Sequence, residues 1–397
     1  DELLNEGSAL VSYAGYDCYG DRLTKKPTFE DFFTAKYENG TYKRLIAPHQ
    51  PIYAAGYIQD KFAFNDLIFN IGLRVDRYDL NQYVLKDMYC LYATKKVSDV
   101  PGSMNPTGSH PSNMGDNYVV YVDDVTDPST INGYRNGSTW YNAYGVEVDD
   151  PTVIASSTGI APYLVDPTQQ QTRTITADAF EDYTPQLSIM PRISFSFPIS
   201  DEALFFAHYD ILTSRPGGSF DAVSYYYLAN NAGAMLDNPN MKATKTIDYE
   251  LGFQQRLTNS SSLKIAAYYR EQRDMAQAIS VLGAYPVNYY TYGNIDFGTS
   301  KGLSLSYDLR RSGNVTLRAN YTLGFSSATG SSASQMLSLL RTDQPNLRIL
   351  APTNWDQRHK FNVSLDYRFA DGKEYNGPKL FGKDILSNSG ANFTVIA

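Results

Sequence analysis

A run of strict alternation near residue 70 limits the possible folds more than any other feature of this sequence. Between positions 67 and 76, one parity is apolar and the other is polar or charged. The apolar positions are Leu67, Phe69, Ile71, Leu73 and Val75, and the polar positions are Asn70, Gly72, Arg74 and Asp76. Because successive side chains of a β-strand point to opposite faces, the segment predicts a strand with one apolar and one charged face. Its regular part is about eleven residues long, roughly twice the usual globular strand, and matches the length that a tilted strand needs to cross a bilayer.

The same alternation returns in one hairpin after another, and it predicts ten strands. Their ranges are 52–63, 67–78, 187–197, 203–211, 246–256, 263–271, 301–311, 315–324, 359–369 and 391–397. Short turns are expected at Asn65, Asp201, Ser260 and Gly313, and long links at 79–186, 212–245, 272–300 and 325–357. Transmembrane β-barrels have this asymmetry, with short periplasmic turns and long extracellular loops.

Composition excludes two broad classes. No apolar run approaches the roughly 18 residues of a membrane-spanning helix, so a helical membrane protein is excluded. The formal net charge of −8 argues against a nucleic-acid backbone as a partner. The 33 tyrosines, against 2 tryptophans, suit strands, membrane-interface girdles and surfaces on which ligands stack.

The alternative to a membrane barrel is a large soluble β-sandwich, which also has one-faced antiparallel strands. Almost every charge inside the predicted strands falls on the polar parity, and Arg77, near a strand end, is an exception. A charged side chain that faces lipid at the midplane costs about 2–4 kcal/mol, so this distribution favours the barrel. We therefore predict an all-β protein with a transmembrane antiparallel barrel in the outer membrane.

The polar parity of these strands is rich in charge. Its members include Arg74, Asp76, Arg192, His208, Asp210, Glu250, Arg270, Arg310, Arg318 and Arg368. A narrow ten-stranded barrel would have to pair nearly all of these charges in a dry core, which is unfavourable. The predicted lumen is therefore wide and holds water or a polar plug, and these residues form its wall.

The chain divides into two predicted parts. Residues 1–50 lack a sustained period and are expected to form an extracellular loop region. Residues 51–397 are expected to form part of a barrel with a long outer loop at about 79–186, in which short strands such as 118–122 occur. The start lacks a signal peptide and the last segment stops within a strand, so we expect a trimmed piece of a longer protein.

No catalytic constellation is recognisable, and no metal site is expected from the four scattered histidines. His208 and Asp210 share one face, and a charge network in the lumen is favoured over a catalytic dyad. Two acidic clusters, at 123–127 and 149–150, have the oxygen ligands that Ca²⁺ prefers but lack an EF-hand spacing. Solvated loop is the favoured interpretation of both clusters, with Ca²⁺ as the alternative and no other cofactor expected.

Aromatic clusters in the predicted outer loops are candidate ligand contacts. They are Tyr225, Tyr226, Tyr227, Tyr289 and Tyr290, with Arg215 nearby in the sequence. Rings of this kind can stack on a sugar, a peptide side chain or a siderophore, although packing within the loops explains them as well. Cys18 and Cys90 flank the first hairpin, and either a disulfide between them or two separate free thiols fits the sequence.

Several motifs together resemble a known family. The segments Tyr57-Ile-Gln-Asp60 and Gly72-Leu-Arg74-Val-Asp76 resemble a characteristic hairpin of TonB-dependent outer-membrane receptors. Asn238-Pro-Asn-Met-Lys242 through Tyr249-Glu250-Leu-Gly252-Phe resembles a second signature of that family, although Ala243 and Thr244 replace its usual Pro and Glu. Tyr321-Thr322 and Trp355-Asp-Gln-Arg-His359 resemble two further landmarks of the barrel.

The resemblance implies a 22-stranded barrel with a plugged lumen, of which about ten strands are present here without the plug domain. It also implies import of a polar ligand, such as a siderophore, vitamin, glycan or peptide, energised by the inner-membrane TonB complex through the plug. An outer-membrane partner subunit or lipoprotein is a further expectation. The alternative function is a non-transporting adhesin or assembly subunit whose loops bind a partner protein.

Overall fold

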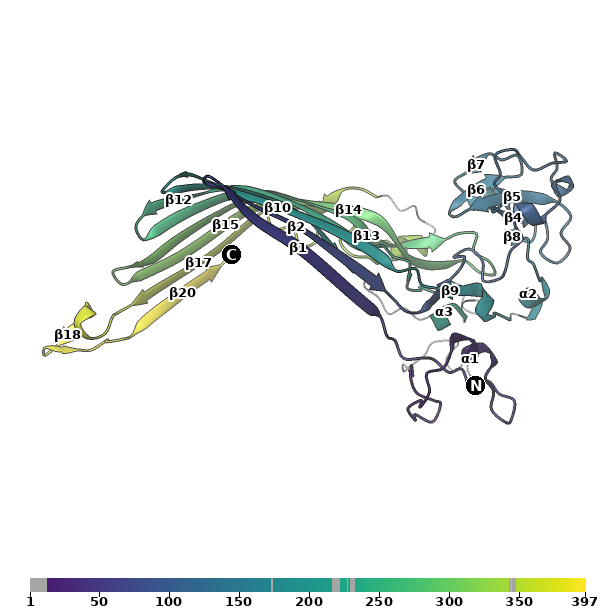
Figure 1. Ribbon diagram of the computed structural model, residues 1–397, viewed down its shortest axis with the longest axis horizontal. Helices are drawn as coiled ribbons and strands as arrows, with labels where there is room; N and C mark the ends of the chain where they lie inside the picture. Colours follow the sequence, from purple (N-terminus) through teal and green to yellow (C-terminus); the bar gives the residue numbers. More distant parts are fainter. Residues whose placement is uncertain are drawn as a thin grey trace.

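The computed structural model describes residues 13–172, 174–215, 222–226, 228, 233–342, 344 and 348–397. Its main feature is one large antiparallel sheet in the order β1-β2-β10-β11-β12-β13-β14-β15-β17-β20 (Figure 1). These strands are β1 (Ile52–Phe64), β2 (Leu67–Asp79), β10 (Gln186–Ser200), β11 (Ala203–Ser214), β12 (Thr244–Thr258), β13 (Ser261–Val281), β14 (Tyr289–Ser312), β15 (Val315–Ala328), β17 (His359–Arg368) and β20 (Gly390–Ile396). The two-residue strand β16 (Ala351–Pro352) pairs with β15 and completes the eleven-stranded sheet. The ten strands expected from alternation are therefore confirmed.

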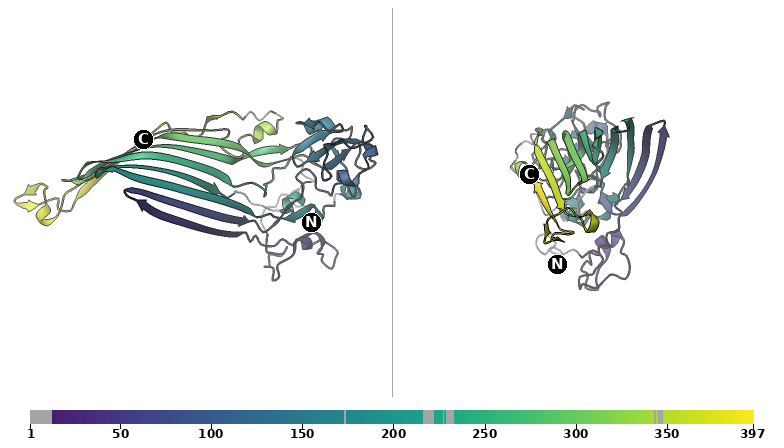
Figure 2. Two further views of the ribbon diagram at one scale, coloured as in Figure 1. Left: turned by 45° about the horizontal axis from the view of Figure 1, so that its top comes forward. Right: turned by 90° about the vertical axis from the view of Figure 1, so that its left-hand side faces the viewer.

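The sheet curves into an open arc, which is visible when the molecule is seen from one end of its long axis (Figure 2, right). Within the described residues, β1 pairs only with β2, and β20 pairs only with β17. An unpaired sheet edge is not stable in hydrocarbon, because its N–H and C=O groups have no water to bind there. In a membrane, both edges of this arc therefore need partner strands.

The strand registers place the predicted wall residues on one face of the sheet. Arg192 lies opposite Asp210, Asp210 opposite Asp248, and Asp248 opposite Arg270, across four neighbouring strands. Residues directly opposite one another share a face, so the charged row continues across the arc. Asp60 departs from the expectation, because it lies opposite Ile71 on the apolar parity, five residues from the Asn65–Asp66 turn.

One predicted connection is wrong. The segment 272–300 was expected to be a long outer loop, but β13 continues to Val281 and β14 starts at Tyr289. Alternation fails there because side chains of both parities are covered: Gln277, Ala278, Val281, Tyr289 and Thr291 are all buried. The link between these two strands is therefore only the short segment 282–288.

The loop at 80–185 has a fold of its own at the outer end of the sheet (Figure 1). We call this whole loop the insert, and it contains a five-stranded sheet in the order β7-β6-β5-β4-β8. Its strands are β4 (Val119–Val122), β5 (Ile131–Asn136), β6 (Thr139–Asn142), β7 (Glu147–Val148) and β8 (Ala161–Pro162), and the pair β3 (Tyr83–Leu85) and β9 (Phe180–Asp182) lies at its base. The strand predicted at 118–122 is confirmed as β4.

The insert packs on the tip of the β13–β14 hairpin. Leu91 N donates to Tyr285 O at 3.1 Å, and Tyr285 N donates to Tyr89 O at 3.0 Å. Gly283 has φ +80°, and a Cβ there would lie 3.0 Å from the ring of Trp140 in the insert. The close approach and the left-handed backbone together explain a glycine at this position.

The opposite end of the sheet carries the tight turns, with one exception. Between β17 and β20, the chain forms a longer link that contains the small hairpin β18 (Lys379–Leu380) and β19 (Lys383–Asp384). Short helices occur elsewhere: α1 (Phe29–Thr34), α2 (Thr168–Thr172), α3 (Ala222–Tyr226) and α4 (Leu337–Leu340). Among the described residues, none of the helices has the length and apolar character needed to cross a membrane.

Candidate ligand-binding site on the polar face

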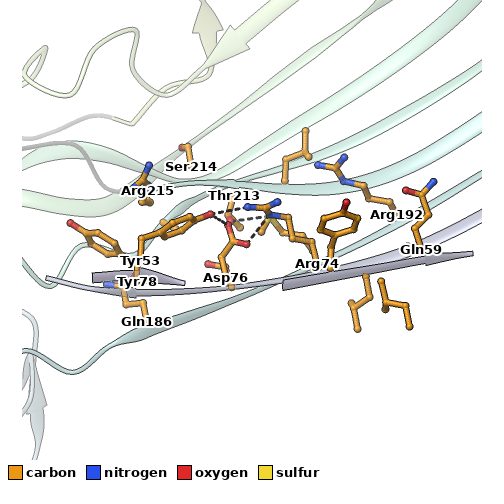
Figure 3. A pocket seen from close by; sticks show the side chains of 18 residues that line it. Tyr53, Gln59, Arg74, Asp76, Tyr78, Gln186, Arg192, Thr213, Ser214 and Arg215 are labelled. Carbon is orange, nitrogen blue, oxygen red and sulfur yellow. Dashed lines mark hydrogen bonds and ion pairs between the residues drawn. The ribbon is translucent and has the colours of Figure 1, made fainter. Parts of the chain in front are cut away.

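A concave site of about 620 Å³ lies on the polar face of β1, β2, β10 and β11, in the half of the sheet nearer the long loops (Figure 3). Its side chains come mainly from the charged parity. The lining includes Tyr53, Tyr57, Gln59, Arg74, Asp76, Tyr78, Gln186, Ser188, Arg192, Thr213, Ser214 and Arg215. The parity rule identified Arg74, Asp76 and Arg192 but did not single out the uncharged residues of the same rows.

The centre of the site is a closed polar cluster. Arg74 Nε lies 2.8 Å from Asp76 Oδ1, and Arg74 Nη2 donates to the Tyr53 hydroxyl at 2.9 Å. The Tyr53 hydroxyl in turn donates to Asp76 Oδ2. The Arg74 charge is thus neutralised by its neighbour, and the three side chains hold one another in place.

Arg215 lies at one end of this site, just beyond the last residue of β11. Its guanidinium carbon is 4.5 Å from the centroid of the Tyr53 ring and 5.9 Å from that of Tyr78. A guanidinium over an aromatic face gains a cation–π interaction and keeps its N–H donors at the ring edges free to bind other groups. Of the six predicted ligand contacts, Arg215 is the one that lines the concave site.

Arg192 lies toward the other end of the site, with Tyr53, Asp76 and Arg74 between it and Arg215 (Figure 3). The lining contains three arginines, Arg74, Arg192 and Arg215, and one carboxylate, Asp76. Because these are its only ordinarily charged side chains, the site carries an excess of two positive charges. Such a surface attracts anions, and low-dielectric walls concentrate its field.

The predicted tyrosines are part of the loop core instead of an open stacking surface. Tyr225 and Tyr289 are 6% and 2% exposed. Their hydroxyls donate to Asp237 O and Met88 O, both at 2.8 Å, and burial raises the pKa of both phenols. Neither ring offers a face to a ligand.

The remaining tyrosines also make internal contacts. The Tyr226 hydroxyl accepts a hydrogen bond from Arg44 Nη2 at 2.7 Å, and the Tyr290 hydroxyl donates to Leu340 O at 3.4 Å. Tyr227 lies outside the described residues. The described tyrosines therefore pack within the loops, which is the other interpretation of these clusters.

Elsewhere on the polar face, the predicted wall residues form pairs. The separations are 2.9 Å for Arg270–Asp248, 3.4 Å for Lys264–Glu250, 3.7 Å for Arg318–Asp308 and 4.0 Å for His208–Asp210. The His208–Asp210 pair is an ion pair only if His208 is protonated, and its assignment to a charge network stays a prediction. Arg368 donates to Asn388, and Arg310 lines a second concavity near the tight turns.

The possible disulfide is not formed. Cys18 is exposed, with its sulfur 2.9 Å from the Tyr37 hydroxyl, whereas Cys90 is buried. Cys90 is enclosed by apolar side chains at the base of the insert, including Leu164, Val281 and Tyr289. Burial raises its thiol pKa to about 12, which keeps Cys90 a neutral, structural thiol.

The acidic clusters organise their own loops. Asp123 accepts hydrogen bonds from the Ser129 and Thr130 amides, each at 2.9 Å, and Asp150 accepts one from the Thr152 amide at 2.8 Å. Partial burial alone would raise the Asp123 pKa, but these bonds, together with one from the Ser129 hydroxyl, lower it to about 2. In the described part of the chain, no three His, Cys, Asp or Glu side chains gather as they would around a metal ion.

Comparison with known proteins gives one family match. The family model described as TonB dependent receptor-like, beta-barrel, matches residues 6–395. A search of curated proteins gives no match.

Solved structures with a similar fold share little sequence. The FrpB iron transporter of Neisseria meningitidis (F3-3 variant) has 11% identity and a TM-score of 0.39 over 80% of this chain and 31% of its own. The ferric-catecholate import receptor Fiu of E. coli K12 has 11% identity and a TM-score of 0.38, covering 83% and 35%. The Serratia marcescens hemophore receptor HasR, solved with its hemophore HasA and heme, has 11% identity and a TM-score of 0.41, covering 81% and 42%. The chain thus spans 31–42% of the length of these proteins.

Proposed function

Because the chain belongs to the TonB-dependent receptor β-barrel family and lies in the outer membrane, we propose that its complete protein imports a polar ligand. The family consists of receptors and transporters, and the fold described above is that of a barrel wall. The ligand would be held at the concave site on the polar face and released inward when the plug moves. The TonB complex of the inner membrane would supply the energy through that plug.

The observation that carries this proposal is the position of the concave site. It opens on the face that the charged rows share, and it lies in the half of the strands nearer the long loops. A polar ligand that arrives from outside therefore meets this site before it meets the pairs nearer the tight turns, such as Lys264–Glu250 and Arg318–Asp308.

The test is a growth and uptake assay in a strain deleted for the receptor, across siderophores, vitamins, glycans and peptides as limiting nutrients. We expect a defect on one nutrient class that full-length protein restores and that a strain lacking TonB shares. Full growth of the deletion strain on every nutrient would contradict import.

A second candidate function rests on the insert. A long loop that builds its own five-stranded sheet and apolar clusters can present a fixed surface to a partner protein. An adhesin, or an assembly subunit that binds an outer-membrane lipoprotein, would use such a surface. Loss of a co-purifying outer-membrane partner on deletion of residues 93–165, with uptake intact, would favour this function.

A further inference from the structure

We propose that Arg192 and Arg215 form a two-point site for an elongated polyanion, a ligand with carboxylate or phosphate groups near both ends. This proposal rests on the proposed function, because it names the ligand class for the same concave site. Nothing in the family match specifies that class.

The first step is that Arg74 is already paired and the other two arginines are not. The Arg74 guanidinium binds the Asp76 carboxylate and the Tyr53 hydroxyl. For Arg192 and Arg215, no carboxylate in the described part of the chain lies within 4.0 Å, whereas Arg270, Arg256 and Arg318 on the same sheet each have one. Among the described residues, Arg310, Arg311 and Arg368 also lack one, but they lie near the tight turns, outside the concave site.

The nearest candidate for Arg192 shows why it stays unpaired. Asp210 lies directly opposite Arg192 on β11, but its Oδ2 atom lies 4.0 Å from His208 Nε2 and forms no ion pair with Arg192. On the other side, Arg192 faces Gly72, which has no side chain to offer. Its guanidinium therefore lines the concave site and has no acidic partner among the residues that the structure describes.

Arg215 is positioned by aromatic rings instead of by an acid. The rings of Tyr53 and Tyr78 lie under its guanidinium, and the Tyr53 hydroxyl is fixed by Arg74 and Asp76. This arrangement orders the side chain, and within the described ranges no carboxylate compensates its charge. A guanidinium with a free planar edge binds carboxylate and phosphate in a bidentate manner, which favours these groups over neutral ones.

The spacing of the two arginines sets the length of the ligand. Arg215 lies five residues along the chain from Asp210, the residue opposite Arg192. At about 3.3 Å per residue, this corresponds to roughly 17 Å between the two backbone positions. A molecule of a few sugar or phosphate units spans a distance of this order, so it can reach both arginines, with the neutral Tyr53–Arg74–Asp76 cluster between them.

The experiment uses the purified full-length receptor and three probes: tetragalacturonate, inorganic tetrapolyphosphate and maltotetraose as the neutral match. Binding is measured by calorimetry at low and high salt for the wild type, R192Q, R215Q and the double variant. R318Q is the control, because Arg318 lies on the same face outside the site and is exposed. Heat-modifiable migration on gels verifies that every variant is folded.

We expect one anionic probe to bind with an affinity that falls at high salt. Each single substitution should weaken binding about tenfold, the double substitution should abolish it, and R318Q should leave it unchanged. The identity of that probe separates carboxylate from phosphate as the recognised group.

Three results would overturn the proposal: no binding of either anionic probe, equal binding of maltotetraose, or equal affinity in the double variant. Equal affinity in the double variant would also be expected if an acidic side chain of the plug were bound to Arg192 and Arg215 in place of the probe. If this binding test fails but the deletion strain shows a nutrient defect, import by the receptor stands. If the deletion strain shows no defect either, import is contradicted as well.

Discussion

The insert and the concave site use arginine in opposite ways. Arg135 in the insert is 3% exposed, and its guanidinium is fully engaged. It binds Asp87, donates to the Tyr121 hydroxyl at 2.8 Å and to Gly137 O at 2.7 Å, and lies over the rings of Tyr89 and Trp140. Arg192 and Arg215 have no acidic partner in the described chain. The difference separates an arginine that holds a fold together from arginines that are available to a ligand.

The tyrosines divide in the same way. Tyr225 and Tyr289 are buried with their hydroxyls bonded to backbone carbonyls, whereas Tyr57 in the concave site is 77% exposed. Because a buried polar group must be paired and an exposed one need not be, the state of the hydroxyl distinguishes the two roles better than the residue type does.

The largest expected effect concerns Arg135, the arginine that stabilises the insert. In R135M, the partly buried Asp87 carboxylate loses its buried partner, which for a fully buried pair costs about 3–5 kcal/mol and sets the upper limit here. We expect the insert to open, measured as faster amide hydrogen exchange across residues 119–148. The control is R256M, whose exposed ion pair with Glu202 contributes at most about 1 kcal/mol. Unchanged exchange in R135M would mean that Arg135 is no more structural than Arg192.

The two cysteines give the next effect, in alkylation rate. At pH 8, iodoacetamide should modify exposed Cys18 at least about a hundredfold faster than Cys90, whose neutral, buried thiol forms almost no thiolate. Peptide mapping by mass spectrometry measures the ratio.

The raised Cys90 pKa also predicts how stability depends on pH. The stabilisation from the buried neutral thiol is fully present below the ordinary thiol value of 9.0 and is lost as pH rises toward about 12. A C90A variant should lose less stability than wild type over that range. Rapid modification of Cys90 at pH 8 would show that the base of the insert is open.

A smaller effect is expected from Y289F. The substitution leaves Met88 O, in the interior of the loops, without its donor, which costs about 1–2 kcal/mol. Thermal unfolding followed by intrinsic fluorescence should detect the shift. The matched change Y57F, in the exposed site, should leave unfolding unaltered, and equal shifts would contradict the division of the tyrosines.

The smallest expected effect concerns the net charge of the concave site and its affinity for a polyanion. D76N removes the one carboxylate in the lining and raises its excess positive charge. In a solvated site the gain is at most about 1 kcal/mol, so a polyanionic probe should bind up to roughly fivefold more tightly. Calorimetry with the probes described above measures the change, and weaker binding would assign Asp76 a direct role in holding the ligand.

Much of the barrel wall was predictable from the sequence. Period-two alternation located all ten long strands, because one face of each is apolar and the other is charged. The signal fails where both faces are covered: Gln277 and Tyr289 are buried on strands whose outer halves were taken for a loop. In the insert only β4 was predicted, and β5 was missed for the same reason, since residues of both parities are buried in it.

The site was predictable only in part. On β1, Tyr53 and Gln59 point to the same face as the residues that pair with Asp76 and Arg74 of β2. The alternation rule could therefore have found them. Composition could not tell whether Tyr225 and Tyr289 stack on a ligand or pack in a core, because that depends on contacts with Met88 and Asp237 far away in the chain. Arg215 was chosen from its place in a loop, and its position over two rings required the fold.

The attachment of the insert to the β13–β14 tip has a mechanical consequence. The loop leaves the sheet at β2 and returns at β10, yet it is bonded to a hairpin three strands further along the arc. The loop therefore links two separated points at the outer end of the curved sheet and fixes the distance between them. Such a link resists flattening of the sheet on this side. Changes in the width of the barrel's outer opening would therefore have to occur elsewhere on its circumference.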